Sequence, residues 1–134
     1  MNVSIILAAG EGTRMKSDMP KVLHKVAGKA ILNYVVDNCI ANAMDKTVVI
    51  VGHKKDDVID YFKDAPLTFI EQTIGEGVPY GTGYAVSCAI DEFSDEDKVY
   101  ILTGDTPLFK EETIARFRAY VESHDFDACV LTAV

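Results

Sequence analysis

The chain has 134 residues, enough for one domain with a substantial core, and its 49% hydrophobic and 25% charged residues are typical of a soluble globular protein. Its net charge of −8 argues against nucleic acid as a general partner. Cys39, Cys88 and Cys129 lie far apart without zinc-site spacing, so we expect buried thiols in a reducing cytoplasm. Met1 leads directly into a core strand, and we expect no signal peptide.

The first predicted element is a short, apolar, β-branched strand at residues 3–8, far too short to cross a membrane. A loop of small residues follows at 9–15 and contains two glycines. Glycines let a backbone turn and approach a ligand closely, so that successive N–H groups converge on an anion. Arg14 and Lys21 supply cations that can neutralise phosphate charge. Strand, loop and cations together predict a phosphate-binding site.

Two better-known phosphate loops do not fit this stretch. A dinucleotide-binding loop needs a third glycine where this chain has Met15, and a Walker A loop needs a Gly-Lys-Ser/Thr sequence that is absent. An ordinary strand-to-helix turn is the plain alternative. Residues 1–30 nevertheless carry a local charge of +3, which leaves −11 for the rest of the chain. A basic island in an acidic protein suits a small polyanion such as a nucleoside triphosphate.

Strands and helices then alternate along the chain. The apolar spacing predicts a helix over about 31–43, a strand at 47–51, a short helix around 58–62, a strand at 67–70, a helix after Gly81 that continues to Ile90, a strand at 99–102, a helix around 114–121 and a fifth strand at 128–131. This alternation predicts an α/β fold of three layers, α/β/α, with a mostly parallel, Rossmann-like sheet in one domain spanning 1–134.

Open parallel sheets bind ligands beyond the carboxyl ends of their strands, at the point where the strand order reverses. Gly10, His53, Gln72 and Asp105 all follow carboxyl ends, so we expect the fold to gather them. The acidic run 91–97 precedes a strand and therefore belongs at the opposite edge, as a solvated turn.

Asp105 and Gln72 are the most informative of these residues. A carboxylate at a strand's carboxyl end can hold Mg²⁺ against a triphosphate, although an aspartate that caps the turn before Pro107 is the alternative. The Gln72 amide offers both a donor and an acceptor, which can match uracil, although such a residue alone is most often a surface residue.

The sequence resembles the sugar-phosphate nucleotidyltransferases along nearly its whole length. The resemblance is carried by LAAGEGTRM from Leu7 to Met15, PKVLH from Pro20 to His24, AGK from Ala27 to Lys29, TGDTPL from Thr103 to Leu108, and Gly81-Thr82-Gly83. Within that superfamily these motifs most resemble the uridyltransferase domain of bacterial N-acetylglucosamine-1-phosphate uridyltransferase. In that family the domain precedes a left-handed β-helix acetyltransferase domain, of which this chain contains nothing.

The resemblance implies transfer of a nucleotidyl group from UTP to N-acetylglucosamine-1-phosphate, giving UDP-N-acetylglucosamine for peptidoglycan and pyrophosphate. It implies Arg14 on the leaving pyrophosphate, Lys21 on the α-phosphate and Mg²⁺ on Asp105. It also implies a nucleotide site formed by Leu7, Ala8, Ala9, Gly10, Gly12, Thr13, Gln72, Gly81, Thr82, Thr103 and Gly104. Thr82 is also expected to cap a helix amino terminus. The segment 73–80 is longer than its family counterpart, and we expect a mobile insertion at the pocket rim.

Family members continue beyond the position where this chain ends, with residues that bind the sugar and a second metal ligand. We therefore expect the nucleotide-binding portion of a longer, cytoplasmic enzyme that forms homo-oligomers through C-terminal regions and binds neither nucleic acid nor membrane. Three alternatives stay open: a related enzyme for CTP or another sugar phosphate, a non-catalytic nucleotide-binding module, and an assembly fragment whose exposed sheet edge pairs with another chain.

Overall fold

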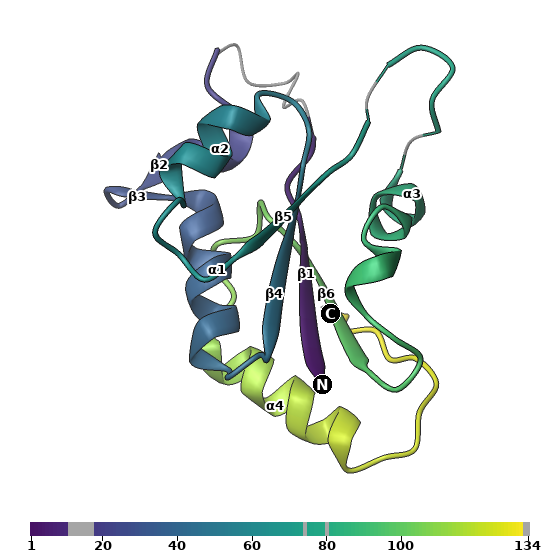
Figure 1. Cartoon of the computed structure of the whole chain (residues 1–134). Helices are drawn as coiled ribbons and strands as arrows, with labels where there is room; N and C mark the ends of the chain where they lie inside the picture. Colours follow the sequence, from purple (N-terminus) through teal and green to yellow (C-terminus); the bar gives the residue numbers. More distant parts are fainter. Residues whose placement is uncertain (11–17, 74, 80, 133–134) are drawn as a thin grey trace.

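A four-stranded parallel sheet forms the centre of the molecule (Figure 1). The structure is a computed structural model that describes residues 1–10, 18–73, 75–79 and 81–132. The strands stand in the order β5-β4-β1-β6, and each pairs with its neighbour in parallel. Their bounds are Asn2–Leu7 for β1, Lys46–Val51 for β4, Thr68–Glu71 for β5 and Lys98–Thr103 for β6. The first four predicted strands are confirmed, each within about a residue or two.

The two central strands are apolar because both of their faces are covered. In β1, Val3 and Ile5 point to one face and Ile6 to the other, and all three are fully buried. The same alternation runs through β4, which pairs in register with β1. Continuous β-branched runs of this kind are typical of parallel strands buried on both sides.

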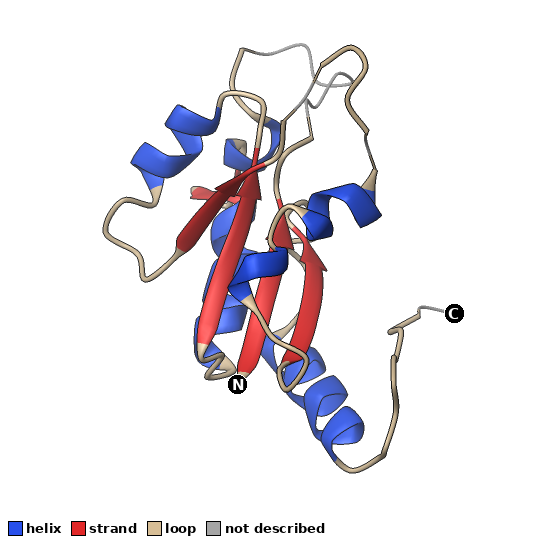
Figure 2. Ribbon diagram, turned by 45° about the vertical axis from the view of Figure 1, so that its right-hand side comes forward, coloured by secondary structure: helices blue, strands red, loops and turns tan. Residues whose placement is uncertain are grey.

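Helices cover the two faces and make the three predicted layers (Figures 1 and 2). On one face, α1 (Ile31–Ala41) and α2 (Lys55–Tyr61) bury Leu32, Val36 and Val58 against the sheet. On the other face, α3 (Thr82–Ser87) buries Ala85. Helix α4 (Glu111–Glu122) packs beside α1. No helix in the described residues is long and apolar enough to cross a membrane.

Four short elements were not predicted from the sequence. A 3₁₀ turn, η1 (Lys21–Leu23), leads into a small hairpin of β2 (Lys25–Val26) and β3 (Lys29–Ala30). The hairpin turn consists of Ala27 and Gly28, both with positive φ, as a tight two-residue hairpin turn requires. The helix expected to run to Ile90 ends at Ser87, and a second 3₁₀ turn, η2 (Ile90–Glu92), follows.

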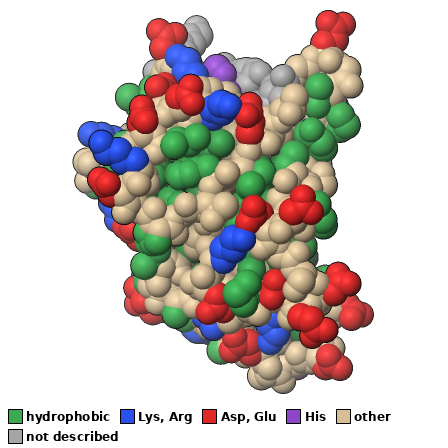
Figure 3. Space-filling view, in the orientation of Figure 1, with side chains coloured by type: hydrophobic (Ala, Val, Ile, Leu, Met, Phe, Trp, Pro, Cys, Tyr) green, Lys and Arg blue, Asp and Glu red, His purple; other side chains and the backbone are tan. Residues whose placement is uncertain are grey.

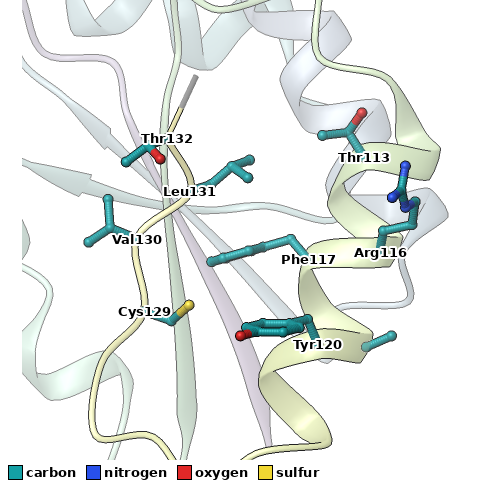
Figure 4. A pocket seen from close by; sticks show the side chains of 9 residues that line it. Thr113, Arg116, Phe117, Tyr120, Cys129, Val130, Leu131 and Thr132 are labelled. Atoms are coloured by element: carbon teal, nitrogen blue, oxygen red, sulfur yellow. The ribbon is translucent and has the colours of Figure 1, made fainter. Parts of the chain in front are cut away.

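The predicted fifth strand is wrong. Residues 128–131 form no strand, because a strand needs a partner for its backbone groups and none of the described strands pairs with this segment. The tail instead runs past α4, where Cys129 to Thr132 and residues of α4 line a cavity of about 660 Å³ (Figure 4). Phe117 and Tyr120 point from α4 toward the tail. This cavity contains none of the predicted site residues.

The expected burial of the cysteines holds for one of the three. Cys39 is fully buried in α1, and burial raises the pKa of its thiol. Cys88 and Cys129 are only half-buried. All three thiols are free.

The acidic run 91–97 lies at the amino-terminal edge of the sheet, as predicted. Asp97 accepts a hydrogen bond from the Met1 amine at 2.8 Å, and Lys98, the next residue, begins β6. Glu92 forms an ion pair with Lys46, the first residue of β4. The run therefore stabilises strand starts and lies opposite the glycine loop.

Ile6→Ala should lower the free energy of unfolding by about 2–5 kcal/mol, because it leaves a cavity in a fully buried position between β1 and α1. Urea unfolding followed by circular dichroism measures this loss. Ile90→Ala is the matched control, since Ile90 is 59% exposed, and should change stability by less than about 0.5 kcal/mol. Equal effects of the two substitutions would contradict the described core.

Candidate functional site

The candidate site lies where the strand order reverses. Strand β4, the next long strand in the chain after β1, pairs on one side of β1, and β6 pairs on the other. The crevice between the carboxyl ends of β1 and β6 is therefore the switch point of the sheet, the place where open α/β sheets bind ligands. The glycine loop leaves β1 here, and the segment that carries Asp105 leaves β6 here.

Two backbone hydrogen bonds join these strand ends. The N–H of Gly104 donates to the Leu7 carbonyl oxygen at 2.9 Å, and the N–H of Ala8 donates to the Ile50 carbonyl oxygen at 2.9 Å. The end of β1 and the start of the glycine loop are thus held between β4 and the residue that follows β6. Leu7, Ala8, Gly104 and Asp105, all predicted site residues, are brought together.

Position 104, where the ends of β1 and β6 meet, has no room for a side chain larger than that of glycine. A Cβ atom on Gly104 would lie 2.9 Å from the Leu7 carbonyl oxygen and 3.3 Å from Cδ1 of Leu32. The nearer contact is with backbone, which cannot move aside as a flexible side-chain end could. Glycine therefore permits the close approach of the two strand ends.

Lys21 and Asp105 form an ion pair next to the contact between Gly104 and Leu7. Lys21 Nζ lies 2.9 Å from Asp105 Oδ2, although the residues are 84 positions apart. Lys21 begins η1, which is fixed to the core by buried Pro20, Val22 and Leu23. The side chains of Lys21 and Asp105 are 40% and 42% exposed, so both remain open to a ligand from solvent.

The pair keeps Asp105 ionised. The hydrogen bond from Lys21 is the main reason that the pKa of the Asp105 carboxyl lies below its ordinary value, and burial opposes this shift. The carboxylate therefore presents negatively charged oxygen at neutral pH. Thr106 Oγ1 donates to the Thr103 carbonyl oxygen at 3.0 Å and fixes the turn on which Asp105 sits.

The predicted base-recognition residues lie at the same edge, away from the ion pair. The Gln72 N–H donates to the Val51 carbonyl oxygen at 2.7 Å, which places Gln72 beyond β5. Because β5 and β6 are separated by three interstrand spacings, Gln72 and Asp105 belong about 14 Å apart. The loop that follows Gln72 rises above the sheet toward α3 (Figure 1).

Gly81 and Thr82 lie at the start of α3, which packs on the face of the sheet opposite α1. Gly81, with φ of 104°, is the N-cap residue of α3, and Thr82 is the first residue inside the helix. The predicted capping role of Thr82 is therefore wrong. Ala85 of α3 packs in the same cluster as Ala9, so the helix start lies beside the base of the glycine loop.

Gly12, Thr13 and Arg14 lie outside the described residues, as do Ile74 and Tyr80 in the 73–80 segment. Sequence reasoning missed the direct contact between Lys21 and Asp105 and a second contact at Asp18. Lys54, which follows β4, has left-handed backbone geometry with φ of 52°, and its Nζ donates to the Asp18 carbonyl oxygen. No pattern in the sequence signals this contact.

The donor set suits a hard divalent cation that arrives with a phosphate ligand. The described residues contain no group of three or more His, Cys, Asp or Glu side chains arranged to hold a metal. Asp105 offers one ionised carboxylate, and Mg²⁺ in nucleotide enzymes is held by one or two carboxylates with phosphate oxygens and water. Asp105 alone among the predicted residues would hold the ion.

The surface around the strand ends has mixed charge. In Figure 3, the upper left of the molecule carries Lys and Arg side chains among acidic ones, whereas the lower right is predominantly acidic. The strand ends that bear the glycine loop lie in the upper half (Figures 1 and 3).

Comparison with known proteins decides the family. The profile of the MobA-like NTP transferase domain matches residues 4–134. The chain belongs to this family. Its glycine loop, Lys21 and Asp105 are therefore residues of an NTP transferase domain.

This NTP transferase domain is also similar to curated bacterial proteins. It is 43% identical over 129 residues to the bifunctional protein GlmU of Clostridioides difficile, an alignment that covers 96% of this chain and 27% of the relative. It is 41% identical over 130 residues to the bifunctional protein GlmU of Fervidobacterium nodosum, covering 97% and 27% respectively. The chain thus spans about a quarter of the length of these relatives.

Solved structures share the fold at low sequence identity. A nucleotidyl transferase from Methanothermobacter has a TM-score of 0.75 and 18% identity, covering 90% of this chain and 57% of that one. Rv0371c from Mycobacterium tuberculosis has a TM-score of 0.77 and 16% identity, covering 91% and 61%. A complex of Rv0371C with manganese has a TM-score of 0.72 and 15% identity, covering 91% and 60%. These likenesses show the nucleotide-diphospho-sugar transferase type of fold.

Gly104→Ala should lower the free energy of unfolding by about 1–3 kcal/mol, because the added methyl group overpacks the junction against the Leu7 carbonyl. Thermal unfolding measures the change. Gly83→Ala is the control: a Cβ atom there meets nothing within 4 Å, and alanine favours α3, so this variant should be equally or more stable. A neutral Gly104→Ala would contradict the close approach described here.

Lys21→Ala should raise the pKa of the Asp105 carboxyl toward its ordinary value, since the hydrogen bond from Lys21 is the main cause of the lowered pKa. An NMR titration of the Asp105 side-chain carbon measures both values. Because the folded-state pKa is depressed, the pair stabilises the protein above the unfolded pKa, and this stabilisation is lost as pH falls through the folded pKa. The effect on stability should be small, because both side chains are exposed.

Proposed function

We propose that this chain is the nucleotide-binding part of an enzyme that transfers the uridylyl group of UTP to N-acetylglucosamine-1-phosphate. The products are UDP-N-acetylglucosamine, which would serve peptidoglycan synthesis, and pyrophosphate. Support comes from membership of the NTP transferase family and from about 40% identity to proteins named bifunctional protein GlmU. Since the chain spans about a quarter of those relatives, the whole reaction is a proposal for a longer polypeptide that contains it.

The Lys21–Asp105 pair at the switch point is the observation that carries this proposal. It presents one cation and one ionised carboxylate, 2.9 Å apart, beside the start of the glycine loop. A triphosphate with a divalent cation is a ligand of complementary composition, because its phosphate oxygens match an ammonium group and its metal matches a carboxylate.

The proposed chemistry needs no activated nucleophile. A phosphate oxygen of the sugar phosphate attacks the α-phosphorus of UTP, a new P–O bond forms, and the bond to the β-phosphate oxygen breaks with release of pyrophosphate. The nucleophile is already an anion, so no general base is required. The chain's task is to position the reactants in line and to neutralise charge.

Each predicted site residue then has a proposed role. Lys21 Nζ donates hydrogen bonds to the α-phosphate oxygens, and the backbone N–H groups at the start of the glycine loop, around Gly10, hold phosphate. Gln72 orients the base from the carboxyl end of β5, with Gly81 and Thr82 beside it. Arg14 binds the leaving pyrophosphate. Mg²⁺ bound at Asp105 would supply electrostatic stabilisation of the phosphate charge.

A cytoplasmic location is part of the proposal. The three cysteines are free, as expected of a protein in a reducing compartment. We propose homo-oligomer formation only for the longer polypeptide, through regions outside this chain. No nucleic acid or membrane is proposed as a partner.

In a longer polypeptide that contains this chain, Lys21→Ala and Asp105→Asn should each lower turnover by about 10²- to 10³-fold, because each removes an electrostatic contact made to the reacting phosphates. Magnesium-dependent pyrophosphate release from UTP and N-acetylglucosamine-1-phosphate measures this. Lys29→Ala, which breaks the exposed ion pair with Asp37 on α1, is the matched control and should keep its turnover.

Near-normal turnover of either site variant would refute the role assigned to that residue. Pyrophosphate release with CTP but not UTP would refute the assignment of the base. Binding of UTP without pyrophosphate release by any longer polypeptide would instead identify a nucleotide-binding module.

A further inference from the structure

The Lys21–Asp105 pair leaves each group already neutralised in the free protein. Lys21 Nζ donates to Asp105 Oδ2, and within the described part of the chain this is the ion pair that each of the two residues makes. The two groups expected to contact different parts of a ligand therefore contact each other first. A ligand that binds to either group therefore comes close to the opposite charge of the other.

We propose that this ion pair makes the site selective for the complex of a divalent cation with a nucleoside triphosphate, over either the bare cation or the metal-free nucleotide. The inference rests on the proposed function, because it assumes that Asp105 holds the cation and Lys21 the phosphate. It adds a role for the pair itself: the two residues determine the form in which the nucleotide is bound.

A bare divalent cation binds poorly for a reason of charge. At Asp105 it comes close to the Lys21 ammonium group, which is a second cation. Lys21 is fixed through η1, whose neighbours Pro20, Val22 and Leu23 are buried, so its backbone cannot retreat far from Asp105. Like charges at such a distance repel even when partly exposed to water.

A metal-free nucleotide binds poorly because its phosphates are repelled by the Asp105 carboxylate. At Lys21 its phosphate comes close to the Asp105 carboxylate, which has the same sign of charge. Asp105 cannot retreat either, because the turn that carries it is tied to β1 through the Gly104–Leu7 hydrogen bond and closed by Thr106. Only a ligand with a cation and an anion together provides a new counter-ion for both residues at once.

The two partial ligands should therefore bind cooperatively. The cation removes the cost that the nucleotide would otherwise meet at Asp105, and the nucleotide removes the cost that the cation would meet at Lys21. This is a coupling free energy between two adjacent sites, and it is reciprocal. Because both side chains are about 40% exposed, each effect should be about two- to fivefold in affinity rather than many orders of magnitude.

The first test measures binding of Mn²⁺ alone to the 134-residue chain, by electron paramagnetic resonance of the free ion. Lys21→Ala should bind Mn²⁺ about two- to fivefold more tightly than the unaltered chain, although it removes a residue of the nucleotide site. Asp105→Asn should lose this binding. Lys29→Ala makes the same change of charge in an ion pair of similar exposure and should bind Mn²⁺ as the unaltered chain does.

The second test measures binding of UTP in the presence of EDTA, by isothermal titration calorimetry. Asp105→Asn should bind metal-free UTP about two- to fivefold more tightly than the unaltered chain, because Lys21 is free and the repulsive carboxylate is gone. Asp37→Asn, the partner of Lys29, is the control of equal charge and should bind as the unaltered chain does. High salt should reduce the difference, since exposed charges are screened.

The outcomes separate this inference from the proposed function. If Lys21→Ala gains no affinity for Mn²⁺ and Asp105→Asn gains none for metal-free UTP, the selectivity proposal is overturned. The proposed site stands in that case if Asp105→Asn binds the manganese–UTP complex more weakly than the unaltered chain does. If Asp105→Asn binds that complex as tightly as the unaltered chain, the assignment of Asp105 as metal ligand fails, and the proposed function fails with it.

Discussion

The parallel pairing of β1 with β6 is the constraint on which the candidate site depends. Their register, Leu7 opposite Thr103, brings both strands to an end at the same level, and the Gly104 N–H continues the pairing to the Leu7 carbonyl. Residues separated by about a hundred positions in the chain thereby become neighbours. Without this pairing, the glycine loop would still follow a buried strand, but Lys21 would have no Asp105 beside it.

The Lys21–Asp105 pair has little importance for stability, and we propose that its importance lies in ligand binding. An exposed ion pair of this kind contributes roughly 0.2–1 kcal/mol to folding, far less than the burial of a single core isoleucine such as Ile6. The same two charges, presented to a triphosphate, form contacts that can change a reaction rate by orders of magnitude. The magnitudes therefore favour a role for the pair in ligand binding, while the apolar clusters on the two faces of the sheet hold the fold together.

Much of this architecture could be predicted from local sequence. The apolar β-branched runs identified the four paired strands, and the rule for carboxyl ends placed Gly10, Gln72 and Asp105 at one edge. The prediction of a strand at 128–131 was wrong because an apolar run indicates only that a segment could form a strand. It does not show that a partner strand is available for pairing. The direct contact of Lys21 with Asp105 could not be predicted, since it depends on how η1 packs against α1. Gly81, rather than Thr82, caps α3 because the chain enters the helix at a positive φ that glycine adopts readily.

The candidate site lies between β1, which is paired on both sides, and β6, an edge strand of the described sheet. This position affects how hydrogen bonds near the site open locally. Strand β1 is hydrogen-bonded on both sides, by β4 and β6, whereas β6 pairs with β1 alone among the strands of the described sheet. Amide protons of β1 should thus exchange with solvent only in rare global openings, while those on the outer flank of β6 exchange readily. The glycine loop follows a strand that is paired on both sides and Asp105 follows an edge strand, so a local opening of β6 changes the distance between them.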